Sequence, residues 1–203
     1  GLTPESVKKL ISQGHEILVE TDAGFGSGFS DGDYINLGAR IVKKPKEVFE
    51  NAELIIKVKE PQSVEVNLLK PDQLLFTYLH LAANKNLTQG LMDSQSTCIA
   101  YETVTSSSNS LPLLAPMSEV AGKISIQAGA RALEKTQRGR GVLMSGAYGA
   151  PPADVVIIGC GVVGFNAALI AVGMKANVIL IDKSEPRLSE LYKYFEGKVT
   201  TVV

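Results

Sequence analysis

The stretch Val155–Gly164, VVIIGCGVVG, decides the fold of the second half of this chain. Its four leading apolar residues are typical of a buried strand, and glycines follow at Gly159, Gly161 and Gly164. Between a strand and a helix, this spacing is typical of dinucleotide-binding domains. The first glycine allows a tight turn, the second lets a pyrophosphate approach the backbone, and the third lets helix and strand pack closely.

The residues after this turn complete the pattern. A predicted helix, Asn166–Met174, leads into a predicted strand, Asn177–Ile181, which ends at Asp182. Asp182 lies 23 residues beyond Gly159, close to the ~20 at which an acidic residue binds ribose hydroxyls. Because a carboxylate repels a 2′-phosphate there, the sequence predicts NAD rather than NADP as cofactor. Arg187 either contacts the adenine or a phosphate, or is an ordinary exposed helix arginine.

The pattern reaches the end of the first half of a dinucleotide fold. A predicted helix, Glu185–Phe195, and strand, Lys198–Val203, finish one βαβαβ unit, whereas a full fold has two. We therefore expect residues 113–203 to hold a linking helix and half of a nucleotide-binding domain. The linking helix is expected to run from a cap at Ser118 to about Leu133.

Upstream of this region, short helices and apolar strands alternate. Strands are predicted at His15–Glu20, Ala39–Val42, Leu54–Val58, Leu74–Leu79 and Thr97–Tyr101, with helices at Pro4–Gly14, Asp33–Leu37, Pro45–Asn51, Val64–Leu69 and Asn84–Asp93. This alternation predicts a parallel α/β sheet, because strands that are buried on both faces are continuously apolar. The polar run Thr103–Asn109, followed by two prolines, marks a boundary. The expected fold class is α/β, with two Rossmann-like parallel-sheet domains at residues 1–112 and 113–203.

Composition excludes several classes of protein. The chain has 203 residues, 45% hydrophobic and 20% charged, which is typical of a folded globular protein. Its net charge of -1 leaves no basic excess, so a nucleic-acid partner is not expected. No apolar run approaches the ~20 residues that span a bilayer, so no membrane partner is expected either. Cys98 and Cys160 are too few for a disulfide scaffold, and no residue cluster has the spacing of metal ligands, so no metal site is predicted.

Two side chains at strand ends are candidates for chemistry. His80 follows the apolar run LLFTYL, and Lys59 follows LIIKV. Open α/β sheets bind ligands at the carboxyl ends of their strands, and a cation beside an imidazole suits an anionic substrate such as a carboxylate. The alternatives are a capping histidine and a solvated lysine. Glu60 and Glu102 also lie near strand ends, but no spacing singles them out.

Three longer blocks are more specific than the glycine turn. They are KVKEP at 57–61, FTYLHLA at 76–82 and APMSEVAG at 115–122. With the LTP opening and VVIIGCGVVG, they closely resemble the alanine dehydrogenase family over nearly the whole chain. The related domain of nicotinamide nucleotide transhydrogenase shares the LTP opening and the glycine turn but lacks the histidine of FTYLHLA. His80 therefore separates these two interpretations.

The resemblance implies an NAD-dependent amino-acid dehydrogenase that reversibly deaminates L-alanine to pyruvate and ammonia. It implies that Lys59 binds the substrate carbonyl or carboxylate and that His80 is the proton donor and acceptor. The implied cofactor contacts are Ser118, Val162, Asp182 and Arg187, in addition to the three glycines of the turn.

The resemblance also implies a cytoplasmic, hexameric enzyme of two domains. In this family a strand with a substrate-binding arginine precedes the LTP block, and a catalytic aspartate lies in the C-terminal half. Neither is found in this chain, so we expect the first domain to lack its first strand. A second hypothesis is that the chain only binds NAD or assembles with partners. Such a chain should expose a sheet edge and apolar surface, and should have negligible turnover.

Overall fold

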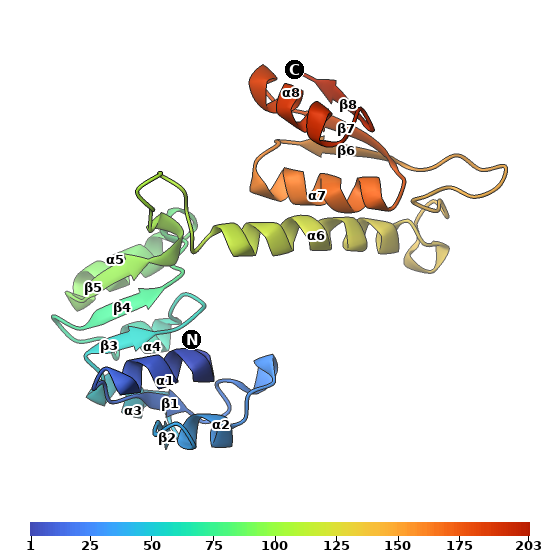
Figure 1. Ribbon diagram of the computed structural model, residues 1–203. Helices are drawn as coiled ribbons and strands as arrows, with labels where there is room; N and C mark the ends of the chain where they lie inside the picture. The colour runs from blue at the N-terminus through green and yellow to red at the C-terminus, as the bar shows by residue number, and fades with distance from the viewer. The chain divides into compact units, whose positions relative to one another are not determined.

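The computed structural model describes residues 1–203 and has two compact units (Figure 1), Gly1–Leu111 and Pro112–Val203. The three sheets are all parallel. No helix combines the length and the apolar character that a membrane crossing requires.

The first unit begins with a small α/β layer. Its elements are α1 (Pro4–Ser12), β1 (Leu18–Glu20), η1 (Phe25–Ser27), α2 (Asp31–Ile35) and β2 (Arg40–Val42). The Thr3 side chain accepts a hydrogen bond from the Ser6 N–H and so caps α1, and Pro4 occupies its first turn. Val7 and Tyr34 are buried between the helices and the β1–β2 sheet.

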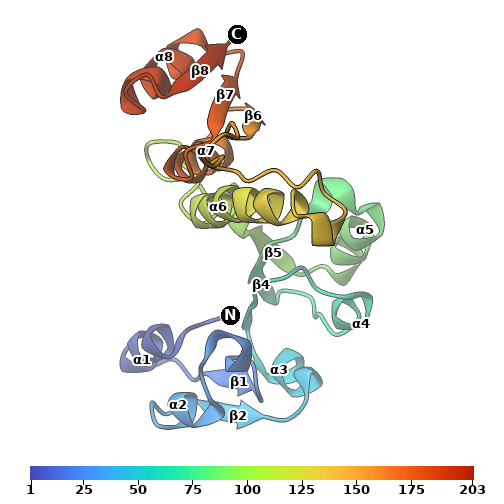
Figure 2. The same cartoon turned by 90° about the vertical axis from the view of Figure 1, so that its right-hand side faces the viewer.

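The rest of the first unit is a layer of three strands, labelled in Figure 1, with helices α3, α4 and α5, labelled in Figure 2. Its elements are α3 (Pro45–Asn51), β3 (Leu54–Ile56), α4 (Ser63–Val66), β4 (Leu74–Thr77), η2 (Leu81–Ala83), α5 (Lys85–Ser94), β5 (Thr97–Ala100) and η3 (Tyr101–Thr103). The strand order is β3–β4–β5. Leu75 is fully buried on the central strand, and Phe49 of α3 and Leu91 of α5 pack into the same core.

The first unit differs from the sequence prediction in the number of its sheets and in the bounds of several elements. We expected one parallel sheet, whereas the strands form two, β1–β2 and β3–β4–β5, without hydrogen bonds between them. The strands are three or four residues long, so each buries little side-chain surface, and β1 and β3 each pair on one side alone. The strand predicted at His15–Glu20 begins only at Leu18, because His15 and Glu16 are exposed.

The second unit is the dinucleotide-type fold that the glycine pattern predicts. Its elements are α6 (Ala115–Ala132), η4 (Lys135–Gln137), β6 (Asp154–Ile158), α7 (Val162–Gly173), β7 (Asn177–Ile181), α8 (Glu185–Tyr194) and β8 (Val199–Val202), with strand order β6–β7–β8. Helix α6 lies along α7, and the bounds of β7 are those predicted (Figure 1). Leu180 and Ala168 are fully buried between the sheet and its helices.

The prediction that Ser118 caps the linking helix is wrong. Helix α6 begins at Ala115, and the Ser118 N–H donates to the Leu114 carbonyl at 3.1 Å, so Ser118 lies inside the first turns. Pro116 explains the earlier start, because proline has no N–H to lose and its fixed φ suits the first turn of a helix. Helix α7 also begins earlier than expected, at Val162, immediately after the turn.

One face of the second sheet is uncovered. Ile157 of β6 is buried against the core that α7 contributes to, whereas its neighbours Val156 and Ile158 are 54% and 82% exposed. Strand β6 is also an edge of its sheet. The expectation of an open sheet edge beside exposed apolar surface is therefore confirmed.

Candidate functional site

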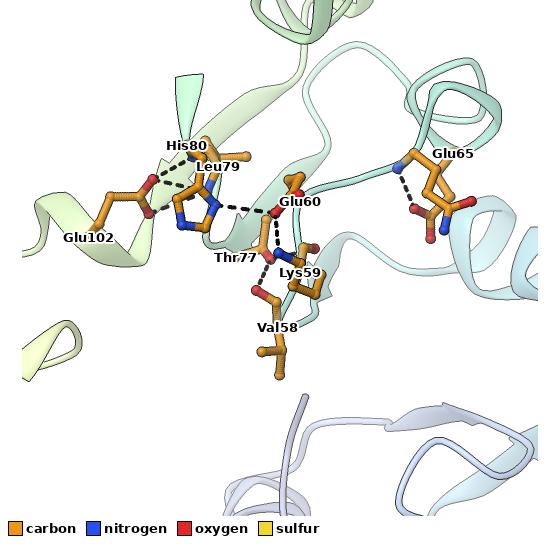
Figure 3. A network of polar contacts seen from close by, with 9 residues as sticks. Val58, Lys59, Glu60, Glu65, Thr77, Leu79, His80 and Glu102 are labelled. Atoms are coloured by element: carbon orange, nitrogen blue, oxygen red, sulfur yellow. Dashed lines mark hydrogen bonds and ion pairs between the residues drawn. The ribbon is translucent and has the colours of Figure 1, made fainter. Parts of the chain in front are cut away.

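The ends of three neighbouring strands place four polar side chains on one edge of the first unit (Figure 3). Lys59 and Glu60 follow β3, His80 follows β4, and Glu102 follows β5. Since β3, β4 and β5 are parallel, their carboxyl ends share this edge. We call these four residues the rim. The predicted juxtaposition of Lys59 and His80 is therefore present, with two carboxylates that the sequence did not single out.

Glu60 joins the two candidate residues through a single oxygen atom. Its Oε2 lies 3.2 Å from Lys59 Nζ and 3.2 Å from His80 Nδ1. A hydrogen bond from its own N–H, followed by that from the Lys59 ammonium, lowers the pKa of the Glu60 carboxyl. The Lys59 and His80 side chains are 74% and 55% exposed, so both remain accessible to a small molecule.

The contact with Glu60 assigns the two nitrogens of the His80 ring. A carboxylate accepts hydrogen bonds, so in the neutral ring Nδ1 carries the proton and Nε2 keeps its lone pair. The Tyr78 ring stacks on the imidazole with centroids 6.0 Å apart, and Tyr101 meets Tyr78 edge-on. Burial, and then the proximity of Tyr78, raise the pKa of the Tyr101 hydroxyl, so this residue stays neutral. Because Nδ1 is bonded to Glu60, Nε2 is the ring atom that remains for proton transfer.

The main chain of His80 is in an unusual conformation. Its φ of 49° and ψ of 38° are left-handed, which L-residues other than glycine adopt infrequently. The Glu102 carboxylate accepts the His80 N–H at 2.7 Å and the Leu79 N–H at 3.1 Å. Burial alone raises the pKa of Glu102, but these N–H groups outweigh it and hold that pKa below its usual value. Glu102 is therefore a charged acceptor for this turn.

Lys59 is held through its main chain as well. The Thr77 side chain is fully buried at the end of β4, and its hydroxyl lies 3.0 Å from the carbonyl oxygens of both Val58 and Lys59. A hydroxyl has one proton to donate, so the two carbonyls share it. The segment after β3 is thereby tied to the neighbouring strand.

An open cleft of about 690 Å³ begins at Lys59 and Glu60. It is lined by residues in and next to α4 and α5, which include the polar Gln62, Asn67 and Asn84 and the apolar Val66 and Leu87. His80 does not line it. The rim therefore has space on the Lys59 side for a small molecule.

The glycine turn of the second unit has the geometry that its three glycines require. Gly159 has φ of +90°, in the left-handed region. A Cβ on Gly164 would lie 1.9 Å from the Gly159 carbonyl oxygen, so only glycine fits there. A Cβ on Gly161 would meet nothing within 4 Å, so the space in front of α7 is open. No side chain caps α7, and its first N–H groups face that space.

Asp182 and Arg187 hold the peptide of Cys160, inside this turn. Asp182 Oδ2 accepts the Cys160 N–H at 2.6 Å, and Oδ1 accepts the Ser184 N–H at 2.9 Å. These two bonds lower the pKa of the Asp182 carboxyl. Arg187 Nε donates to the Cys160 carbonyl at 3.0 Å, and its guanidinium lies over the Phe165 ring. Arg187 is therefore no ordinary exposed arginine, whatever else it binds.

The space, N–H groups and carboxylate oxygens of this turn fit a dinucleotide. The open space beside Gly161 and the uncapped N–H groups of α7 suit a pyrophosphate. Each Asp182 oxygen uses one acceptor position on the backbone and keeps another for a hydroxyl group.

Comparison with known proteins places the chain in a family. The model of the alanine dehydrogenase/PNT N-terminal domain matches residues 1–121, and that of the C-terminal domain matches residues 125–203. The chain belongs to the alanine dehydrogenase/PNT family. The resemblance found in the sequence blocks is thereby confirmed.

Individual members are similar over the whole chain. The alanine dehydrogenase of Halomonas elongata is 52% identical over 201 residues, which are 99% of this chain and 54% of the relative. That of Methanococcus maripaludis is 52% identical over 202 residues, 100% of this chain and 54% of the relative. The chain thus spans about half the length of these relatives.

Solved structures give the same result. An L-alanine dehydrogenase superposes with a TM-score of 0.90 at 50% identity, covering 99% of this chain and 55% of the other. The α/β fold class with parallel sheets is thereby confirmed. A transhydrogenase from Sinorhizobium meliloti reaches a TM-score of 0.80 at 23% identity, covering 99% of this chain and 59% of the other, which shows a shared fold.

Within the alanine dehydrogenase/PNT chain, the remaining candidate contacts lie in the second unit. Val162 is the first residue of α7 and is 44% exposed, next to the open space of the turn. Ser118 lies on α6 and is half-buried. Their contacts with a cofactor stay predictions.

Sequence reasoning did not single out Glu60 and Glu102 of the rim, and it missed Thr77, which bonds to the Lys59 main chain. The signal for Glu60 was its place beside Lys59 in KVKEP, and that for Glu102 was its place just after the third strand. Both signals become specific only when the strand order puts the three strand ends side by side. Thr77 gave no signal, because a threonine inside an apolar strand is an ordinary strand residue.

Proposed function

We propose that this chain carries substrate- and cofactor-binding parts of an enzyme that reversibly oxidises L-alanine to pyruvate and ammonia with NAD. One observation carries the proposal: Lys59 and His80, from adjacent strand ends, meet on one oxygen of Glu60. An ammonium and an imidazole at that distance suit a small molecule with a carboxylate beside an oxygen that must gain or lose a proton.

In the proposed reaction, the Lys59 ammonium binds the carbonyl or carboxylate oxygen of the substrate. It stabilises the negative charge that develops there. His80 accepts or donates the proton through Nε2, because Glu60 holds Nδ1. NAD, when bound, would supply the hydride acceptor. Water would add to the imine carbon that the oxidation leaves, and ammonia would depart, so the new oxygen of pyruvate comes from water.

The proposed cofactor contacts are all in the second unit. The N–H groups at the start of α7, around Gly161 and Val162, would hold the pyrophosphate. Asp182 would accept the adenosine ribose hydroxyls, and Arg187 would stabilise the turn and contact the adenosine part. Ser118 is proposed to reach a phosphate. As in the sequence-based expectation, we propose a cytoplasmic homohexamer with no nucleic-acid or membrane partner.

The test uses the native protein that contains this chain, supplied with L-alanine and NAD. We expect absorbance at the wavelength of NADH to rise only when both are present. If the protein instead exchanges hydride between two nicotinamide nucleotides and ignores alanine, it is a transhydrogenase and the proposal is wrong.

A second candidate function is supported by the exposed apolar face beside β6. It is that the 203-residue chain by itself binds NAD or assembles without catalysing a reaction. Isothermal titration with NAD and sedimentation of the chain measure these properties directly. An alanine-dependent rate in the isolated chain would contradict this second candidate.

A further inference from the structure

The His80 imidazole can act only if the ring is presented in one direction. His80 is the third residue after β4, which ends at Thr77, and it is the N-cap residue at the start of η2. Its left-handed φ of 49° decides where the Cα–Cβ bond points. A change of φ to the right-handed or extended region would swing the side chain away from Glu60.

The His80 side chain makes no capping hydrogen bond to its own local backbone. A left-handed position is often occupied by glycine, or by a residue such as asparagine whose short side chain hydrogen-bonds to the local backbone. The imidazole instead contacts Glu60, which is distant in sequence. The local backbone bonds of η2, from the Ala83 N–H to the His80 carbonyl and from the Asn84 N–H to the Leu81 carbonyl, both at 3.1 Å, leave the His80 N–H itself without a partner in η2. That N–H is accepted by a side chain from another part of the unit.

Glu102 contacts the main chain of Leu79 and His80 from the end of a neighbouring strand. It comes from η3, directly after the neighbouring strand β5. Its Oε1 alone lies within hydrogen-bonding distance of two consecutive N–H groups, those of His80 at 2.7 Å and of Leu79 at 3.1 Å, and Oε2 lies 3.3 Å from the latter. Leu79 is 1% exposed, so its N–H has little access to water as a substitute.

We infer that Glu102 is a positioning residue for His80: its carboxylate holds the left-handed turn and thereby directs the imidazole toward Glu60 and the substrate. Glu102 touches the main chain and not the ring, so it takes no part in proton transfer itself. The two carboxylates of the rim thus divide the work, since Glu60 sets the ring tautomer and Glu102 sets the ring direction. The inference rests on the proposed role of His80.

Two substitutions separate positioning from other roles. Glu102→Gln keeps the size of the side chain and a carbonyl oxygen that can accept both N–H groups. Glu102→Leu keeps the size but has no acceptor. Exposed Glu16 in the same unit supplies the matched control, Glu16→Gln.

In the native protein, Glu102→Leu is expected to lower kcat for L-alanine about 10- to 100-fold, the usual cost of displacing a reacting group by about 1 Å. The KM for NAD should stay unchanged, and Glu102→Gln should recover most of kcat. The pH at which kcat/KM is half-maximal should be the same in Glu102→Gln and wild type. A Glu102→Leu enzyme with wild-type kcat would overturn the inference, as would a Glu102→Gln enzyme no better than Glu102→Leu.

A readout without catalysis keeps this inference separate from the proposed function. In ¹⁵N-labelled protein, the His80 amide proton should resonate far downfield and exchange slowly with solvent, because a carboxylate accepts it at 2.7 Å. Glu102→Leu should abolish both properties, and Glu16→Gln should leave them intact. If the wild type did not oxidise alanine but the amide behaved this way, the proposed function would fail and the positioning role would stand. If the amide were unaffected by Glu102→Leu, the positioning role would fail.

Discussion

The two units present their candidate sites in opposite ways. The rim of the first unit consists of long side chains whose main chains are tied to the next strand, by Thr77 and Glu102. The glycine turn of the second unit consists of exposed backbone at residues without side chains. Asp182 and Arg187 stabilise this turn through hydrogen bonds to the Cys160 peptide. The first site depends on the chemistry of its side chains, whereas the second depends on the space that its glycines provide by having no Cβ. Substitutions should therefore affect chemistry in the first unit and binding or folding in the second.

The largest effect is expected from His80→Ala in the native protein. Removing a general acid–base group should lower kcat about 10²- to 10⁴-fold, with little change in the affinity for NAD, which the second unit is proposed to bind. Steady-state rates with varied alanine and NAD measure both quantities. The control is His15→Ala, which removes the other histidine at an exposed position. Loss of NAD affinity in His80→Ala would break the division between the two units.

The converse substitution is Asp182→Ala. We expect the Kd for NAD to rise about 10- to 100-fold, the typical cost of losing a hydrogen bond to a charged group. The preference over NADP should narrow, because the repulsion of the 2′-phosphate is lost. Fluorescence titration with each nucleotide gives the two Kd values, and an unchanged ratio between them would show that Asp182 does not select the cofactor.

Two glycines of the turn should separate binding from stability. Gly164→Ala places a methyl group 1.9 Å from the Gly159 carbonyl, so it should lower the free energy of unfolding by about 1–3 kcal/mol. Gly161→Ala meets no atom within 4 Å, so it should leave stability nearly unchanged and weaken NAD binding alone. Urea unfolding and NAD titration of both variants provide the comparison. Equal stability losses would contradict the turn geometry described here.

The two units also differ in how much of their candidate sites could be predicted from the sequence. The turn could be predicted almost residue by residue, because each glycine has a local steric reason that its neighbours reveal. For the rim, the strand ends and hence His80 and Lys59 could be predicted, but Glu102 lies 22 residues from the amide that it accepts. Partners so distant are brought together only by strand order. The start of α6 was mispredicted because Ser118 is a good capping residue in isolation, and Pro116 within the first turn outweighed it.

The smallest expected effect concerns pH. The pKa of Asp182 is lower in the folded chain than in the unfolded one, so the folded state binds fewer protons. Its stabilising contribution is therefore complete above the unfolded value of about 3.9 and is lost as the pH falls through the folded value. Urea midpoints of the second unit should fall on acidification, and less so in Asp182→Asn. Part of the pH dependence should remain, because Lys198 lowers the pKa of Glu196 in the same unit.

The chain has one cysteine in each unit, and their surroundings make them a pair of reporters. Cys160 is 1% exposed inside the glycine turn, and burial, followed by the charge of Asp182, raises the pKa of its thiol. Cys98 is half-buried on β5, beside the Ser96 hydroxyl. A thiol reagent should modify Cys160 only when the turn opens, whereas its reaction with Cys98 follows the first unit. The labelling rates of the two cysteines in the wild-type protein would thus measure how fast each unit opens. NAD should slow the labelling of Cys160 and leave that of Cys98 unchanged.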